Sequence, residues 1–308
     1  MFNNVPDWLT EKVRDLRSSP YHDRESIYFN AAGWTIAWYL RRNIRGETDP
    51  FFEFPTDDGV IESNHPLWQA HVNRVVSVAE TLFLMRNSPG FEEQRKRMAE
   101  RSIRPAFFEM LSAKQFLKNN FQISARPESG KRGDDFDFIA SRAGESINVE
   151  VTALTAEEFS EKTIVNRLND KRDQVPKTSP AVLFCVIPER WTSAGNVNWD
   201  EVLGRITGNF FRGTKRINVV IFWMEQHLPI ASGGSALISV RKPYLNTNTY
   251  HQLDAPFLLG GARRSEDARR ACITGDGLDD LERESYDSEF FRWVDSLVYP
   301  DSGTLEDW

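Results

Sequence analysis

The chain has 308 residues, of which 38 are Lys or Arg and 45 are Asp or Glu, so its formal net charge at pH 7 is −7. This charge argues against a surface that coats nucleic acid over its whole area, and against a generally basic membrane-binding protein. The length allows one large domain or one core with appended regions, and either can bury a sizeable apolar interior.

The two cysteines, Cys185 and Cys272, lie far apart and follow no zinc or disulfide spacing. The first 17 residues mix charged with apolar side chains and lack the apolar run of a signal peptide. No stretch approaches the roughly 20 apolar residues of a membrane span. We therefore expect a soluble, cytoplasmic protein with reduced thiols and no membrane partner.

The first third of the sequence has the periodicity of helices. These are expected over residues 7–17 and 25–42, from His65 to about Arg86, and within 91–119. Glycines and prolines over residues 46–66 predict a loop. The segment 91–119 is expected to contain one or two helices, with a break around Ser102 to Pro105.

The period of the pattern then changes to that of strands. Short runs rich in β-branched and aromatic residues predict strands over 121–125, 134–140, 147–152, 181–187 and 217–223. The last two are almost continuously apolar, as central strands covered on both faces would be. Helices are expected between strands, over 157–175 and over 199–212. The alternation predicts an α/β fold in which helices flank a central sheet.

Three regions are expected along the chain: an N-terminal helical region (1–100), an α/β core (101–264) and an acidic C-terminal segment (265–308). The last contains 4 Lys or Arg and 13 Asp or Glu residues. It can fold as a helix around Phe290 to Val294 that docks on the body, or cover a basic groove, and the sequence leaves both open.

Two of the predicted strands have a polar face. In residues 134–139 strand alternation places Asp135 and Asp137 on one face, and Phe136 and Phe138 on the other. The connection over 141–145, which contains Gly144, is short enough for a hairpin.

In the second strand of this hairpin, Asn148, Glu150 and Thr152 share the polar face. Pairing the two strands makes Asp137 and Glu150 neighbours. Two carboxylates so close repel each other unless a proton or a cation lies between them, and hard oxygen ligands suit Mg²⁺ or Mn²⁺. A metal ion there can polarise a phosphodiester and activate a water. The alternative is an ordinary amphipathic hairpin with a solvated polar face.

Charged residues on the flanking helices favour a site. Glu109 lies along the apolar side of its predicted helix, where a carboxylate needs a partner. Lys171 and Gln174, three residues apart, lie beside the apolar stripe of the helix expected over 157–175 and can point toward the sheet. Singly, Glu109 is more simply a boundary residue and Lys171 a solvated lysine; their joint placement favours function.

A basic cluster precedes Glu109 and is formed by Arg95, Lys96, Arg97, Arg101 and Arg104. Because glutamates interleave with it, the simple interpretation is a solvated helix face. Its closeness in sequence to the acidic residues also suits a nucleic-acid channel.

In this order and spacing, these elements resemble the PD-(D/E)XK nuclease superfamily, which has the restriction-endonuclease-like fold. The resemblance covers roughly residues 101–225, about 40% of the chain, and rests on four segments: Arg104 to Glu109, Gly133 to Phe138, Ile147 to Thr152 and Lys171 to Gln174. It implies a central mixed sheet and one or two Mg²⁺ ions that cut a phosphodiester.

By position, Asp137 is similar to the family's metal-binding Asp, with Asp135 as the competing assignment, and Glu150 matches the first residue of the (D/E)XK element. Glu109 resembles a helical Glu that some members use as a further metal contact. Gln174 resembles a helical Gln that supports the site in several branches.

Thr152 stands where the family has its catalytic lysine, and a hydroxyl supplies neither a cation nor a strong base. Lys171 is the first candidate to replace that lysine and Lys162 the second. The resemblance therefore implies a Mg²⁺-dependent endonuclease that acts on nucleic acid, with DNA preferred. The alternative is an inactive nuclease fold that binds nucleic acid or a protein partner.

Overall fold

The computed structural model describes residues 4–18, 24–40, 68–100, 103–126, 135–193, 197–229, 235–253, 255–259 and 289–300. Its helices are α1 (Asp7–Asp15), α2 (Arg24–Leu40), α3 (Trp68–Met85), α4 (Phe91–Glu100), α5 (Ile103–Leu117), α6 (Glu161–Arg172), α7 (Glu189–Ser193), α8 (Trp199–Arg212) and α11 (Glu289–Val298). Two short 3-10 helices are η1 (Leu16–Ser18) and η3 (Pro256–Leu258). The loop expected over 46–66 and the start of the helix expected from His65 lie outside the described residues.

A mixed sheet forms the centre of the described part of the chain. It contains β1 (Gln122–Ala125), β2 (Phe138–Arg142), β3 (Glu145–Ala153), β4 (Ala181–Ile187), β5 (Val219–Pro229) and β6 (Ser235–Leu245), side by side in that order. Strands β3, β4 and β5 run parallel, and the pairs β1–β2, β2–β3 and β5–β6 are antiparallel. The expected α/β architecture is confirmed.

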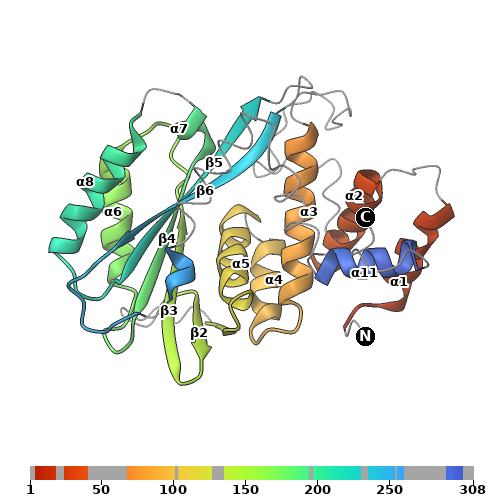
Figure 1. Ribbon diagram of the computed structural model, residues 1–308, viewed down its shortest axis with the longest axis horizontal. Coiled ribbons are helices and arrows are strands. Elements are labelled where there is room, and N and C mark those ends of the chain that lie inside the picture. Colours follow the sequence, from red (N-terminus) through yellow and green to blue (C-terminus); the bar gives the residue numbers. More distant parts are fainter. Residues whose placement is uncertain are drawn as a thin grey trace.

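Helices cover both faces of this sheet. In Figure 1, α3, α4 and α5 lie on one side, and α6 and α8 lie on the other. Two apolar clusters fill the two interfaces: one includes Phe138 and Val149 with residues of α3 and α5, and the other includes Leu183 and Cys185 with residues of α6 and α8. Every residue of β4 is buried, which confirms the expectation that this apolar run is a central strand.

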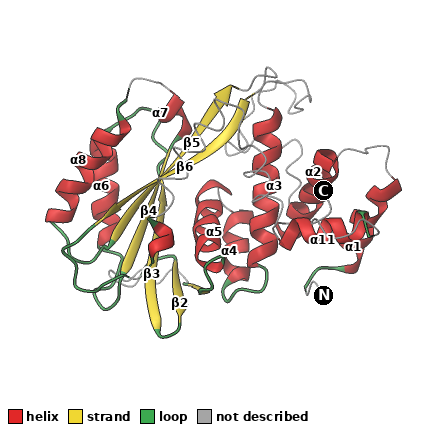
Figure 2. Cartoon of the chain, in the orientation of Figure 1, coloured by secondary structure: helices red, strands yellow, loops and turns green. Residues whose placement is uncertain are grey.

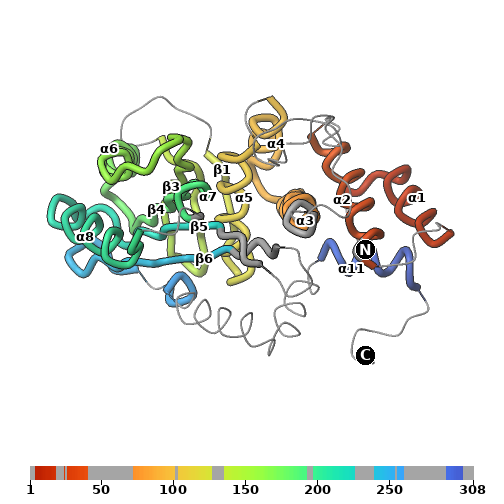
Figure 3. Tube along the Cα trace, turned by 90° about the horizontal axis from the view of Figure 1, so that it is seen from above, coloured from red at the N-terminus to blue at the C-terminus, as the bar shows by residue number. Residues whose placement is uncertain are grey.

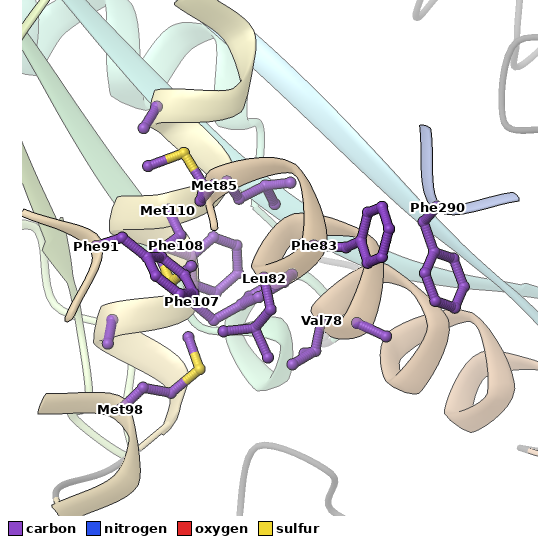
Figure 4. Close-up of a cluster of buried hydrophobic side chains, with 14 of the residues drawn as sticks. Val78, Leu82, Phe83, Met85, Phe91, Met98, Phe107, Phe108, Met110 and Phe290 are labelled. Atoms are coloured by element: carbon purple, nitrogen blue, oxygen red, sulfur yellow. The ribbon is translucent and has the colours of Figure 1, made fainter. Parts of the chain in front are cut away.

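The remaining helices extend the first layer away from the sheet. Figures 2 and 3 show α1, α2 and α11 beyond α3, so the helix expected around Phe290 lies among the N-terminal helices. Phe290 packs edge-on against Phe83 of α3, and Trp293 stacks on Phe83 at 5.0 Å between ring centroids. Figure 4 shows Phe83 and Phe290 in this interface, beside the apolar cluster that joins α3, α4 and α5.

Several boundaries differ from the expected ones. The segment 91–119 forms two helices, and the break falls before Ile103, so Pro105 lies in the first turn of α5, where a proline is tolerated. Helix α6 ends at Arg172, before Gln174. Strand β2 begins at Phe138, four residues later than expected, while β6 and α7 have no counterpart in the sequence-based expectation.

The predicted hairpin is confirmed. Arg142 pairs with Glu145, so the loop consists of Ala143 and Gly144, whose φ angles are 48° and 88°. Two residues with positive φ are typical of the tight turns that match the twist of antiparallel strands. Within the described ranges, no helix combines the length and the apolar character needed to cross a bilayer.

Candidate active site

Asp137 and Glu150 lie opposite each other on two adjacent segments of the chain. Phe138 pairs with Val149 in the ladder between β2 and β3, and continuing that antiparallel register by one residue sets Asp137 against Glu150. The Val151 N–H donates a 2.7 Å hydrogen bond to Oδ2 of Asp137. The hairpin therefore brings the two predicted carboxylates together and holds one oxygen of Asp137 in place.

The two phenylalanines beside Asp137 do not share a face, and that expectation is wrong. Phe138 lies in the cluster beneath α3 and α5, whereas Phe136 lies in the cluster beneath α6 and α8. The physical reason is that regular strand structure begins only at Phe138, so the alternation rule does not extend back to Phe136.

The polar face of β3 is buried. Asn148, Glu150 and Thr152 are 3%, 0% and 5% exposed, because this face of the sheet is covered by the layer that contains α6 and α8. The alternative of a solvated amphipathic hairpin is therefore wrong. A buried carboxylate at position 150 needs a compensating charge.

That charge comes from Lys171. Ser160 caps the N-terminus of α6 by accepting a hydrogen bond from the Thr163 N–H, and Ile164 and Leu168 bury one side of the helix. Lys171, in the last turn, forms an ion pair with Oε1 of Glu150. The Glu150 side chain is 1% exposed and that of Lys171 is 20% exposed, so the ammonium reaches inward from the edge of the layer.

The pKa values show how strongly these groups interact. Burial raises the pKa of Asp137 to about 6, although Lys171 and the Val151 N–H oppose this. Burial and the neighbouring Asp137 carboxylate raise the pKa of Glu150, and Lys171 opposes both. Burial alone would lower the pKa of Lys171, but the Glu150 and Asp137 carboxylates outweigh it and raise the value. Lys171 therefore stays charged beside two carboxylates that cannot both ionise easily without a further cation.

Glu109 approaches the same carboxylates from α5. It raises the pKa of Glu150, so it lies within electrostatic reach, and its side chain is 15% exposed. Oε2 of Glu109 lies 3.9 Å from Nη1 of Arg97 on α4. Glu109 therefore has a positively charged neighbour on α4.

The structure adds Arg97 to this site. In the sequence, Arg97 belongs to the basic cluster before Glu109, whose simple interpretation is a solvated helix face. Its side chain is only 11% exposed, it donates a 3.0 Å hydrogen bond to the Arg126 carbonyl, and it lowers the pKa of Asp137. The sequence feature that indicates this burial is the position of Arg97 next to Met98, because Met98 and Phe91 mark the buried side of α4.

The remaining predicted residues surround this centre. The Asp135 N–H donates to the Gln174 carbonyl at 3.2 Å, which places these two residues together just past the end of α6. Oε1 of Gln174 is buried with no hydrogen-bond partner in the described part of the chain. Thr152 is buried on β3, paired with Cys185 of β4. Lys162 is exposed in the first turn of α6, about 13 Å along the helix from Lys171.

The described residues contain no group of three His, Cys, Asp or Glu side chains that could hold a metal ion. The pair Asp137 and Glu150 nevertheless has a suitable donor chemistry, because carboxylate oxygens are the ligands that Mg²⁺ and Mn²⁺ prefer, and Mg²⁺ usually keeps several waters. Oε2 of Glu150 is buried without a hydrogen-bond partner among the described residues. A two-carboxylate site completed by water fits these residues.

The sequence matches no known protein family and no curated protein. A structural match exists with SfsA of Pyrococcus furiosus in complex with Ca²⁺, at 12% identity and a TM-score of 0.22. The matched region covers 44% of this chain and 61% of that one. A similarity this weak indicates nothing about the function of this protein.

Proposed function

We propose that this protein is a metal-dependent nuclease of the PD-(D/E)XK type, which hydrolyses phosphodiester bonds of nucleic acid, with DNA as the expected substrate. One observation carries the proposal: the buried Glu150 lies opposite Asp137, which directly precedes β2, and the Lys171 ammonium lies on Glu150. Isolated carboxylates are not buried in this way without a cation to offset their charge.

In this proposal Asp137 and Glu150 would hold Mg²⁺ or Mn²⁺, and Glu109 would add a further negative charge beside them. When bound, the ion supplies positive charge to the phosphodiester and activates a water. The Val151 N–H keeps Asp137 oriented, so the carboxylate pair needs little rearrangement to bind a cation.

Lys171 takes the role that Thr152 cannot. A lysine near the carboxylates offsets the negative charge that develops on a phosphate in the transition state, and it can orient the attacking water. The Lys171 ammonium reaches the carboxylates from α6, whereas Thr152, at the family's usual lysine position, offers only a buried hydroxyl. Burial of the centre keeps bulk water away and strengthens these interactions.

The test is cleavage of DNA and of RNA in the presence of Mg²⁺ or Mn²⁺ by the wild type, Asp137→Ala and Glu150→Ala. Each variant is expected to lose activity by a factor on the order of 10² or more, since each removes a charged group at the reacting centre. Glu158→Ala, which changes an exposed carboxylate in the loop after the same strand, serves as the matched control and is expected to keep full activity. Equal cleavage by all four proteins, or none by the wild type, would contradict the proposal.

Thr152 supports the second candidate, an inactive nuclease fold that binds nucleic acid or a protein partner. A lysine is missing from the usual position, and the site then serves only to bind a cation or a phosphate. The same samples distinguish the two: binding of DNA or RNA by the wild type without cleavage in either metal supports this second function.

A further inference from the structure

Lys171 occupies one oxygen of the carboxylate that the proposed metal ion also needs. Its ammonium lies on Oε1 of Glu150, whose side chain is 1% exposed, while Oε2 has no hydrogen-bond partner among the described residues. Asp137 has one oxygen committed to the Val151 N–H. Ammonium and metal ion therefore share the same small set of free carboxylate oxygens.

The charges at this position do not accommodate both cations. Asp137 and Glu150 carry two negative charges when ionised, and Lys171 supplies one positive charge. A divalent ion added beside Lys171 would give this buried position a net positive charge. A divalent ion that replaces the Lys171 ammonium gives it a net charge of zero. The other charged groups that act on these residues are Arg97 and Arg167 on the positive side, and Glu109 and Asp135 on the negative side. Their charges cancel and leave this balance unchanged. Like charges a few ångströms apart in a poorly solvated site repel strongly.

Lys171 is placed so that it can leave. It lies in the last turn of α6, its side chain is 20% exposed, and a lysine ammonium sits on a flexible four-carbon stem. Rotation about the side-chain bonds of Lys171 can turn its ammonium toward solvent. Both oxygens of Glu150 then become available.

We propose that Lys171 is a placeholder for the metal ion: a divalent cation displaces its ammonium from Glu150, and the released ammonium then binds a phosphate of the nucleic-acid substrate. This inference rests on the proposed function and adds an order of events to it. Until a metal ion binds, the Lys171 ammonium offsets part of the negative charge of the two carboxylates. The same side chain then binds the substrate.

The first test measures the reactivity of lysines in the full-length wild type by acetylation and mass spectrometry, with and without Mn²⁺. Release from Glu150 exposes the Lys171 amine, so Mn²⁺ is expected to raise its acetylation rate several-fold. Lys162, exposed on the same helix, is the internal control and is expected to react equally under both conditions. An unchanged or slower reaction of Lys171 in Mn²⁺ overturns the exchange.

The second test compares the affinity for Mn²⁺ of the wild type, Lys171→Met and Lys162→Met by calorimetry. Without the competing ammonium, Lys171→Met is expected to bind Mn²⁺ on the order of tenfold more tightly, the size of effect that an adjacent opposite charge has on proton binding by a carboxylate. Lys162→Met is expected to match the wild type. Equal or weaker binding of Mn²⁺ by Lys171→Met would contradict the proposal that the metal ion displaces the Lys171 ammonium.

The two tests separate this inference from the proposed function. If the wild type binds Mn²⁺ and cleaves nucleic acid while Lys171→Met binds no more tightly, the nuclease assignment stands and the exchange is wrong. If no variant binds Mn²⁺, the metal-dependent function and the exchange fall together.

Discussion

In the proposed nuclease site, Lys171 supplies the positive charge that Thr152 cannot supply. Thr152 lies on β3 two residues after Glu150, on the same buried face, and Lys171 reaches that face from a helix. A lysine at position 152 would have a stem long enough to bring its ammonium to the carboxylates, because two residues along a strand span only about 6.6 Å. The proposed chemistry requires a positive charge near the carboxylates, whichever element of the fold supplies it.

Moving the lysine tests this directly. Lys171→Met is expected to lower the cleavage rate by roughly 10²-fold, because the charge that offsets the phosphate is lost. Adding Thr152→Lys to that variant is expected to recover at least about tenfold of the rate. The measurement is single-turnover cleavage at saturating Mg²⁺. Failure of the double variant to exceed Lys171→Met, with its fold shown intact by circular dichroism, would count against a catalytic role for this charge.

Burial of the Cys185 thiol is expected to lower the stability of the fold at alkaline pH. The thiol is fully buried beside Thr152, and burial raises its pKa from 9.0 to about 12. In the unfolded chain the thiol loses its proton at a lower pH than in the folded chain, so the free energy of unfolding falls as the pH rises between these two values.

Urea unfolding at pH 8 and pH 10.5 measures this effect. The decrease for the wild type is expected to exceed that for Cys185→Ala by at most about 2 kcal/mol, since one pKa unit corresponds to about 1.4 kcal/mol. The comparison between pH values removes the constant effect of the smaller side chain. Equal decreases in both proteins would show that the thiol does not titrate in this way.

At the scale of elements, ion pairs join α3 to the rest of the molecule. Nζ of Lys114 on α5 lies 2.6 Å from Oε1 of Glu80 on α3, and the two side chains are 8% and 11% exposed. Arg74 of α3 lies 2.6 Å from Glu189 of α7 and 3.2 Å from Glu225 of β5. These contacts fix where α3 lies against the sheet layer.

Breaking the first pair is expected to destabilise the protein strongly. Lys114→Ala leaves the Glu80 carboxylate buried and uncompensated, which lowers the free energy of unfolding by about 3–5 kcal/mol. The double variant Glu80→Leu with Lys114→Met is expected to recover most of that loss, because apolar pairs of similar volume replace buried ion pairs well. Lys118→Ala, an exposed lysine one turn later, is the control in chemical denaturation. A loss no larger than in Lys118→Ala would show that the pair contributes little.

At the scale of the whole molecule, α11 connects the end of the described chain to its beginning. Trp293 is 2% exposed and packs on Phe83, and Arg86 of α3 lies 2.6 Å from Glu289. Tyr28 of α2 donates a 2.8 Å hydrogen bond to Asp295. The helices α2, α3 and α11 thus share one apolar interior.

Removing the central ring of this interface tests how far it supports the fold. Trp293→Ala is expected to lower the free energy of unfolding by about 3–5 kcal/mol, through lost burial and the cavity it leaves. Trp8→Ala, whose ring is 43% exposed on α1, provides the matched control and is expected to lose less. If both variants unfold at the same denaturant concentration, α11 does not contribute as the packing indicates.

Much of the fold follows from local patterns. The boundaries of β4 and α8 agree with those expected, because a continuous apolar run and a capped amphipathic segment are properties of neighbouring residues. The hairpin that pairs Asp137 with Glu150 is equally local. Strand β6 was missed because it pairs only with β5 in the described sheet and includes Arg241, Lys242 and Pro243, which are weak strand signals.

The sequence by itself determined that a hairpin sets two carboxylates side by side, and that Glu109 and Lys171 lie on helices able to reach them. Only the tertiary structure decided that the polar face of β3 is buried, that Lys171 contacts Glu150, and that Arg97 belongs to the site. The physical reason is that periodicity reports which side of an element a residue occupies, whereas burial and charge pairing depend on which distant element covers that side.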